Sequence, residues 1–173
     1  AIYGCQKAFD RYGVFTNLIL CAMRHHSPKQ NHLVVRCARE FLGNGVCALD
    51  LAGDEAGYPN EEFEALFEEA RRLVVPFTIH SGECGSARNV AIALQYGAQR
   101  IGHGIAAIKD PALMQACRDA HIGFELCPTS NFQTKAVTDA SSYPLRAFLD
   151  FGLLATINTD NRTVSHTTLT DEY

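Results

Sequence analysis

The sequence predicts an α/β protein in which parallel strands alternate with helices. Short apolar segments rich in β-forming residues recur at a spacing of about 25 residues, and segments of helical period lie between them. Gly, Pro or Asn stands at most of the junctions. Because strands joined by helices pair in parallel through right-handed crossovers, this alternation predicts a parallel sheet.

Six segments have the apolar, β-forming composition of strands that are buried in a parallel sheet. They are residues 14–23, 46–51, 77–80, 100–103, 122–127 and 153–158. The first reads VFTNLILCAM and the second reads VCALDL, so apolar residues dominate both.

Five segments between the strands are predicted as helices from the period of their apolar residues and from their ends. They are residues 32–42, 61–74, 86–96, a helix opened by Asp110-Pro111, and 144–151. Gly43 and Gly45 are expected to end the first helix. Asn60 is expected to cap the second helix, which has an acidic first turn, and Pro76 stops it.

Composition narrows the class of protein further. The 173 residues, 47% of them hydrophobic, suit one buried core, so we expect a single domain over residues 1–173. Lys+Arg 15 against Asp+Glu 19 leaves a formal charge of −4, so no nucleic-acid partner is expected. Since no apolar run could span a bilayer and no signal-peptide pattern opens the sequence, we expect a cytoplasmic protein without a membrane partner.

The cysteines support the same compartment. There are 7 of them, an odd number, and no two form a C-x-x-C pair. A disulfide framework or a zinc ribbon would need paired thiols. We therefore interpret most of them as small buried apolar residues in a reducing cytoplasm.

Polar residues cluster just after five successive strands. The motifs are D-L-A-G-D-E from Asp50, H-S-G-E from His80, G-H-G around His103, C-P-T-S-N from Cys127 and N-T-D-N from Asn158. Both open parallel sheets and eight-stranded barrels build their sites at this carboxyl edge, and the pattern alone does not choose between them. Histidine and carboxylate ligands with a separate glutamate indicate metal-assisted hydrolysis.

Taken in order, these blocks resemble the adenosine deaminase family of metal-dependent hydrolases, and the likeness spans nearly the whole chain. The resemblance implies a (β/α)8 TIM-type barrel with one zinc ion (Zn2+) at its carboxyl face. It also implies that this stretch holds the third to eighth strands. The first two strands and the C-terminal helices of the family barrel are then absent from it, so we expect an incomplete barrel.

The same resemblance implies roles for five residues. His80 and Asp160 correspond to zinc ligands, and Asp160 also to the group touching the metal-bound water. Glu83 corresponds to the acid that protonates the purine ring at N1. His103 corresponds to the residue that orients the zinc-bound hydroxide as it attacks C6, and Gly53 to the glycine whose N–H reaches the purine N3.

Two features depart from the family pattern. The family takes two more zinc ligands from a His-x-His motif on its first strand, and no such motif occurs here; His25 and His26 are adjacent. With two ligands instead of four, zinc binding should be weak, so we expect this stretch alone to be inactive. Asn161 replaces the second aspartate that binds the purine N7 in many members; an amide can still donate there.

The resemblance implies hydrolytic deamination of adenosine and 2′-deoxyadenosine to inosine and ammonia, within purine metabolism. Three alternatives stay open: a deaminase of a related purine or modified nucleoside, a non-catalytic relic or partner subunit that keeps the fold, and a nucleotide-binding open sheet. The last lacks a strand followed by G-x-G-x-x-G. Sequence leaves the oligomeric state open.

Overall fold

The computed structural model describes residues 1–84 and 86–173, which contain six strands joined in parallel. They are β1 (Leu18–Met23), β2 (Val46–Ala52), β3 (Thr78–Ser81), β4 (Arg100–His103), β5 (Gly123–Leu126) and β6 (Leu154–Ile157). β1 pairs with β2, and β3, β4, β5 and β6 pair in that order. A parallel bridge between Leu49 and Phe77 continues the row from β2 to β3. The predicted parallel α/β arrangement is confirmed.

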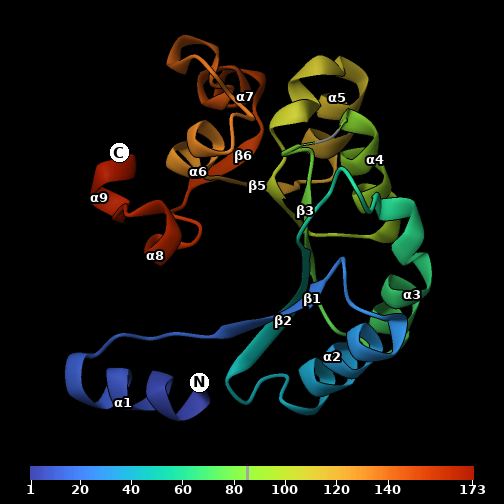
Figure 1. The fold of residues 1–173 in the computed structure, drawn as a ribbon, viewed down its shortest axis with the longest axis vertical. Helices are drawn as coiled ribbons and strands as arrows, with labels where there is room; N and C mark the ends of the chain where they lie inside the picture. Colours follow the sequence, from blue (N-terminus) through green and yellow to red (C-terminus); the bar gives the residue numbers. More distant parts are fainter. Residues whose placement is uncertain (85) are drawn as a thin grey trace.

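Helices follow the strands along the chain. They are α1 (Ile2–Tyr12), α2 (Pro28–Glu40), α3 (Glu64–Arg72), α4 (Ala87–Tyr96), α5 (Pro111–Asp119), α6 (Pro128–Gln133), α7 (Leu145–Phe151), α8 (Arg162–Ser165) and α9 (Leu169–Glu172), with 3-10 turns at Asn60–Phe63, Ile105–Lys109 and Ala140–Ser142. Figure 1 shows α2, α3 and α4 along one side of the curved row of strands. α1 and α9, near the two chain ends, lie on the opposite, open side.

The strand predictions hold at the centres and differ at the ends. β1 begins at Leu18 instead of residue 14, and Val14 and Phe15 are exposed. α1 precedes it and ends at Gly13, whose φ of 67° suits a glycine C-cap; this helix was not predicted. α2 begins at Pro28 because Ser27 and Gln30 form a capping box, a signal that the period of apolar residues did not include.

The predicted role of Asn60 as a helix cap is wrong. Asn60 opens a 3-10 turn, and its side chain is fully buried. Its Nδ2 donates to the hydroxyl of Ser81 and to the carbonyl of Asn89, both at 2.8 Å. A buried amide is stable only when its hydrogen bonds are satisfied, and here the partners lie on β3 and α4. Asp110-Pro111, by contrast, opens α5 as predicted, and the side chain of Asp110 accepts from the N–H groups of Ala112 and Leu113.

The core lies between the strands and the helices. Phe67 of α3 meets Phe77 beside β3 at a ring-centre distance of 4.8 Å, and Phe124 of β5 meets Phe148 of α7 at 5.0 Å. Successive side chains of a strand point to opposite faces of the sheet. When one face packs against the helices, every second residue therefore points to the other face. His80 follows buried Ile79 in this way, so the packing of the core directs His80 away from the helices. Within the described residues, no helix has the length and apolar character needed to cross a membrane.

Candidate metal and active site

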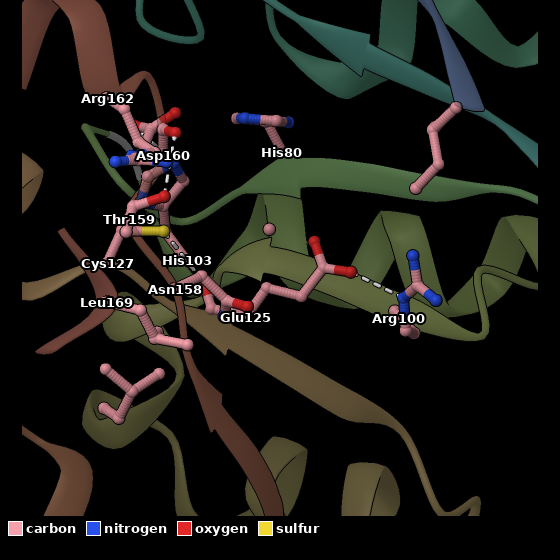
Figure 2. A pocket seen from close by; sticks show the side chains of 13 residues that line it. His80, Arg100, His103, Glu125, Cys127, Asn158, Thr159, Asp160, Arg162 and Leu169 are labelled. Atoms are coloured by element: carbon pink, nitrogen blue, oxygen red, sulfur yellow. Dashed lines mark hydrogen bonds and ion pairs between the residues drawn. The ribbon is translucent and has the colours of Figure 1, made fainter. Parts of the chain in front are cut away.

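The carboxyl ends of β3, β4, β5 and β6 meet at one end of an open cavity of about 590 Å³. His80, His103, Cys127 and Asp160 lie on one side of it, and Figure 2 shows their side chains gathered there. The far side carries an ion pair between Arg100 and Glu125. The parallel register produces this gathering, since it aligns the strand ends.

His80 is held by a carboxylate from the neighbouring strand. Its Nδ1 lies 2.8 Å from Oδ2 of Asp50 on β2, and Asp50 is only 7% exposed. Burial alone would lower the pKa of His80, but the contact with Asp50 and the charges of Asp160 and Glu83 outweigh it and raise the pKa to about 9. The contact has the distance of an ion pair without the alignment of a hydrogen bond, and with Nδ1 against Asp50, Nε2 is the ring nitrogen that can bind a metal once the ring is neutral.

A glycine on β4 makes room for the His80 ring. Gly102 is the register partner of His80 across the strands. A Cβ placed on Gly102 would lie 3.2 Å from Cγ and Nδ1 of His80, closer than side chains normally pack. The ring therefore occupies space that any other residue at position 102 would partly fill.

His103 is buried and its proton can be assigned from its neighbours. Tyr143 donates its hydroxyl to Oδ1 of Asn131, so Nδ2 of Asn131 faces Nδ1 of His103, at 3.0 Å. Nδ1 is then an acceptor, and the proton lies on Nε2, which faces Oε2 of Glu83 at 3.5 Å and Oδ2 of Asp160 at 4.0 Å. Burial is the main reason that the pKa of His103 is lowered, which favours this neutral form.

The backbone at His103 is unusual for a residue with a side chain. Its φ is 59°, in the left-handed region, and Gly104 follows with a φ of 69°. A Cβ on Gly104 would clash with the ring of Phe124, so only glycine fits there. This turn brings the His103 ring back over the strand end and toward the cavity.

Glu83 is placed by side chains of α6 and the turn after it. Its Oε1 accepts from Nδ2 of Asn131 at 3.4 Å and from the hydroxyl of Thr134 at 3.2 Å, while Oε2 faces His103. One carboxylate oxygen is therefore fixed, and the other is directed toward the site.

Asp160 and Asn161 follow β6 and have different surroundings. Asp160, with a φ of 53°, accepts the hydroxyl proton of Ser130 on Oδ2 at 2.7 Å. Asn161 is exposed and caps α8, where Oδ1 accepts from the N–H of Val164 at 3.1 Å. Since the oxygen is occupied, the NH2 group of Asn161 is the part left to donate to another molecule.

The structure brings four of the six predicted site residues together and leaves two at the margin. His80, Glu83, His103 and Asp160 contact one another or a shared neighbour, as described above. Gly53 lies at the end of β2 with a φ of 111°. Across residues 1–84 and 86–173, neither Gly53 nor Asn161 forms a hydrogen bond to those four side chains.

The donor set fits a zinc ion in part. Ligand atoms of His103, Cys127 and Asp160 all lie within 4.8 Å of one another, and the rings of His80 and His103 are 5.1 Å apart. Nitrogen, sulfur and carboxylate oxygen are the atoms zinc binds in proteins. His80, with its far nitrogen oriented by Asp50, and Asp160, oriented by Ser130, are the two best-prepared ligands.

Three residues that hold the site together were not identified from the sequence. Asp50 could have been found as a carboxylate inside the apolar segment 46–51, since a charge there needs a partner. Arg24 and Glu55 are 2% and 5% exposed, and both bind backbone around β3. Glu55 ends the D-L-A-G-D-E motif, which marked it as a strand-end polar residue without indicating its role, whereas no motif includes Arg24.

Solved structures show the class of fold. Over 98% of this chain and 52% of the other, the protein superposes on an adenine deaminase from Arthrobacter aurescens with a TM-score of 0.88 and 26% identity. An amidohydrolase from Burkholderia ambifaria, solved with bound Zn, gives a TM-score of 0.90 at 24% identity over 99% of this chain and 48% of that one. The architecture is thus the TIM-type (β/α)8 barrel of deaminases and amidohydrolases, here in incomplete form, as predicted.

Sequence comparison identifies the family. A sequence model described as adenosine deaminase matches residues 1–173, and the chain belongs to the adenosine deaminase family. Adenosine deaminase from Enterococcus faecalis is 44% identical over 170 residues, which cover 98% of this chain and 50% of that protein. The Haemophilus ducreyi adenosine deaminase is 43% identical over 178 residues, 100% of this chain and 52% of that one. The chain spans about half the length of the curated relatives it matches.

Proposed function

We propose that this chain is the larger part of the active site of a zinc-dependent aminohydrolase that converts adenosine and 2′-deoxyadenosine to inosine and ammonia. The observation that carries the proposal is the meeting of Glu83, His103 and Asp160 at the carboxyl edge of the barrel, with Nε2 of His103 within 4.0 Å of both carboxylates. Membership of the adenosine deaminase family supports the same reaction.

Glu83 is the proton donor of the proposed reaction. Protonating N1 of the purine draws electrons from C6 and so makes that carbon easier to attack. Asn131 and Thr134 fix one oxygen of Glu83, and the other faces Nε2 of His103, from where it is proposed to carry the proton to a ring nitrogen. The acid is therefore preorganised, and orienting it adds nothing to the activation barrier.

His103 and Asp160 act on the other side of C6. The Nε2–H of His103 can donate to an oxygen or to negative charge that develops during attack, and Asn131 keeps the ring in that tautomer. Asp160 is held by Ser130 and, with His80, would hold the metal. Zinc, when bound, supplies an activated water at neutral pH.

Gly53 and Asn161 are proposed to contact the purine itself. Gly53 follows β2 with a φ of 111°, a conformation that suits glycine, and its N–H is proposed to approach the purine N3. The NH2 group of Asn161 can donate to N7, because its oxygen already accepts from Val164.

The remaining ligands must come from outside this stretch, since it contains no His-x-His motif. We propose that residues 1–173 belong to one domain and that this stretch alone is inactive. We also propose a cytoplasmic location, because all seven cysteines are free thiols.

The test is an assay of the complete protein for inosine and ammonia release from adenosine and 2′-deoxyadenosine. We expect turnover that falls to background when a chelator removes the metal and returns when zinc is added. Adenine, AMP and N6-methylated nucleosides are run in parallel, since faster turnover of one of them would assign the site to a related purine. A zinc-loaded protein that deaminates none of these substrates would favour a non-catalytic role.

Asp50 gives a second test through the metal. Replacing Asp50 by Asn removes the charge against Nδ1 of His80 and should weaken zinc binding by about 10- to 100-fold, the usual effect of losing such a partner. Competition with a metal-binding dye measures this in the complete protein. An unchanged zinc affinity would show that Asp50 does not orient His80 for a metal.

A further inference from the structure

A buried carboxylate lies beneath the turn that follows β3. Glu55 is 5% exposed, and its two oxygens accept hydrogen bonds from three successive backbone N–H groups, those of Gly82, Glu83 and Cys84. The bond from Glu83 is 3.0 Å long and that from Cys84 is 3.2 Å. The side chain of Asn89 on α4 donates to Glu55 as well, at 2.8 Å.

These contacts leave the backbone of the turn little freedom. Gly82 has a φ of 74°, and a Cβ there would come 2.6 Å from Cγ2 of Val90, so the turn lies tightly against α4. Charge-assisted bonds to backbone N–H groups are about twice as strong as neutral ones, and burial strengthens them further. Glu55 therefore holds all three backbone N–H groups of residues 82–84, beside the bond that the carbonyl of Gly82 accepts from the N–H of Ala106.

We propose that Glu55 is a positioning residue, whose carboxylate anchors the turn so that the Glu83 side chain points to His103. This inference rests on the function proposed for Glu83. The anchor binds the N–H of Glu83 itself, one bond away from the Cα that carries the side chain. A shift of that N–H moves the carboxylate of Glu83 relative to Asn131, Thr134 and the substrate.

A glutamine cannot replace Glu55 in this role. The four donors around Glu55 all point N–H groups at its oxygens. In Glu55→Gln one oxygen becomes an NH2 group, which is itself a donor and must face at least one of these N–H groups. The variant keeps size and shape, so it changes the anchor more than the packing.

The first experiment is a double-mutant cycle of Glu55→Gln and Glu83→Gln in the complete, zinc-loaded protein. We expect Glu55→Gln to lower kcat by about 10-fold with KM changed less than about 3-fold, since misplacing a catalytic group costs turnover more than binding. In the Glu83→Gln background the same change should lower kcat by less than about 3-fold, because the group that Glu55 positions is gone. Equal losses in both backgrounds would overturn the proposal.

The second experiment does not depend on activity. Amide hydrogen exchange, followed by mass spectrometry on peptides containing residues 82–84, should be at least about 10-fold faster in Glu55→Gln, since the acceptor that protects these groups is lost. Unchanged exchange would overturn the anchor whether or not the protein deaminates adenosine. Faster exchange in a protein without deaminase activity would refute the proposed function alone.

Glu69 provides the matched control. It is also a partly buried, paired glutamate, bound by His32 and Arg36 between α2 and α3, away from the cavity. Glu69→Gln should leave kcat and exchange at residues 82–84 within about 2-fold of the unmodified protein, as expected for an independent site. If Glu69→Gln reproduces the losses of Glu55→Gln, a general loss of structure explains both and the proposal is wrong.

Discussion

Turnover of the complete protein should fall at least about 10²-fold when Glu83 is replaced by Gln, the usual effect of losing a general acid. The amide keeps an oxygen for Asn131 and Thr134, while its NH2 group takes the place of the oxygen that faces Nε2 of His103, so the variant loses the transferable proton and the acceptor beside His103. Zinc content, measured by atomic absorption on the same sample, should not change, because Glu83 is not among the proposed ligands. Steady-state assays with adenosine give the ratio of kcat values.

Glu61→Gln is the control for this variant. Glu61 pairs with Arg88 on the surface, and the same chemical change there should leave kcat within about 2-fold, since the site lies elsewhere. If Glu83→Gln turns over adenosine at a nearly normal rate, another group protonates N1 and the role given to Glu83 is wrong.

Stability should be most sensitive to Arg24. Its guanidinium is 2% exposed and donates to the carbonyl of Tyr58 at 2.6 Å, to Oδ1 of Asn60 at 2.7 Å and to the carbonyl of His80 at 2.6 Å. Arg24→Met keeps the length of the side chain and leaves these buried acceptors without a donor. The free energy of unfolding should fall by about 3–5 kcal/mol, as when one partner of a buried charged network is removed.

Urea denaturation of the complete protein measures the loss, with Arg88→Met as the control. Arg88 is largely exposed and pairs with Glu61, so its replacement should cost less than about 1 kcal/mol. Equal shifts of the unfolding midpoint in the two variants would mean that the Arg24 contacts contribute nothing beyond an ordinary surface pair.

Sequence reasoning located the strands and the strand-end chemistry because both depend on local pattern. The apolar segments 100–103 and 122–127 contain β4 and β5; His80 and His103 lie at the carboxyl ends of β3 and β4, and Asp160 follows β6. Parallel pairing then brings these residues together with no further information. The family resemblance added the barrel, which the alternation of strands and helices could not distinguish from an open sheet.

The residues that escaped prediction are those whose partners lie far away in sequence. Asn60 looked like a helix cap, yet it bonds Ser81 and Asn89, 21 and 29 residues further along the chain. Arg24 reaches the carbonyl of His80 across 56 residues. A local sequence pattern reflects contacts between residues a few positions apart. The sequence around a buried charged residue can therefore look the same as the sequence around a solvent-exposed one.

The space for the His80 imidazole belongs to the adjacent strand. Gly102 stands beside His80 in the register, and its missing side chain leaves the volume the ring occupies. A design that copies this arrangement into another barrel must therefore include both the histidine on one strand and the glycine that pairs with it on the next strand. A histidine grafted alone, opposite an alanine or valine, would have to shift by a few tenths of an ångström to make room for the added Cβ.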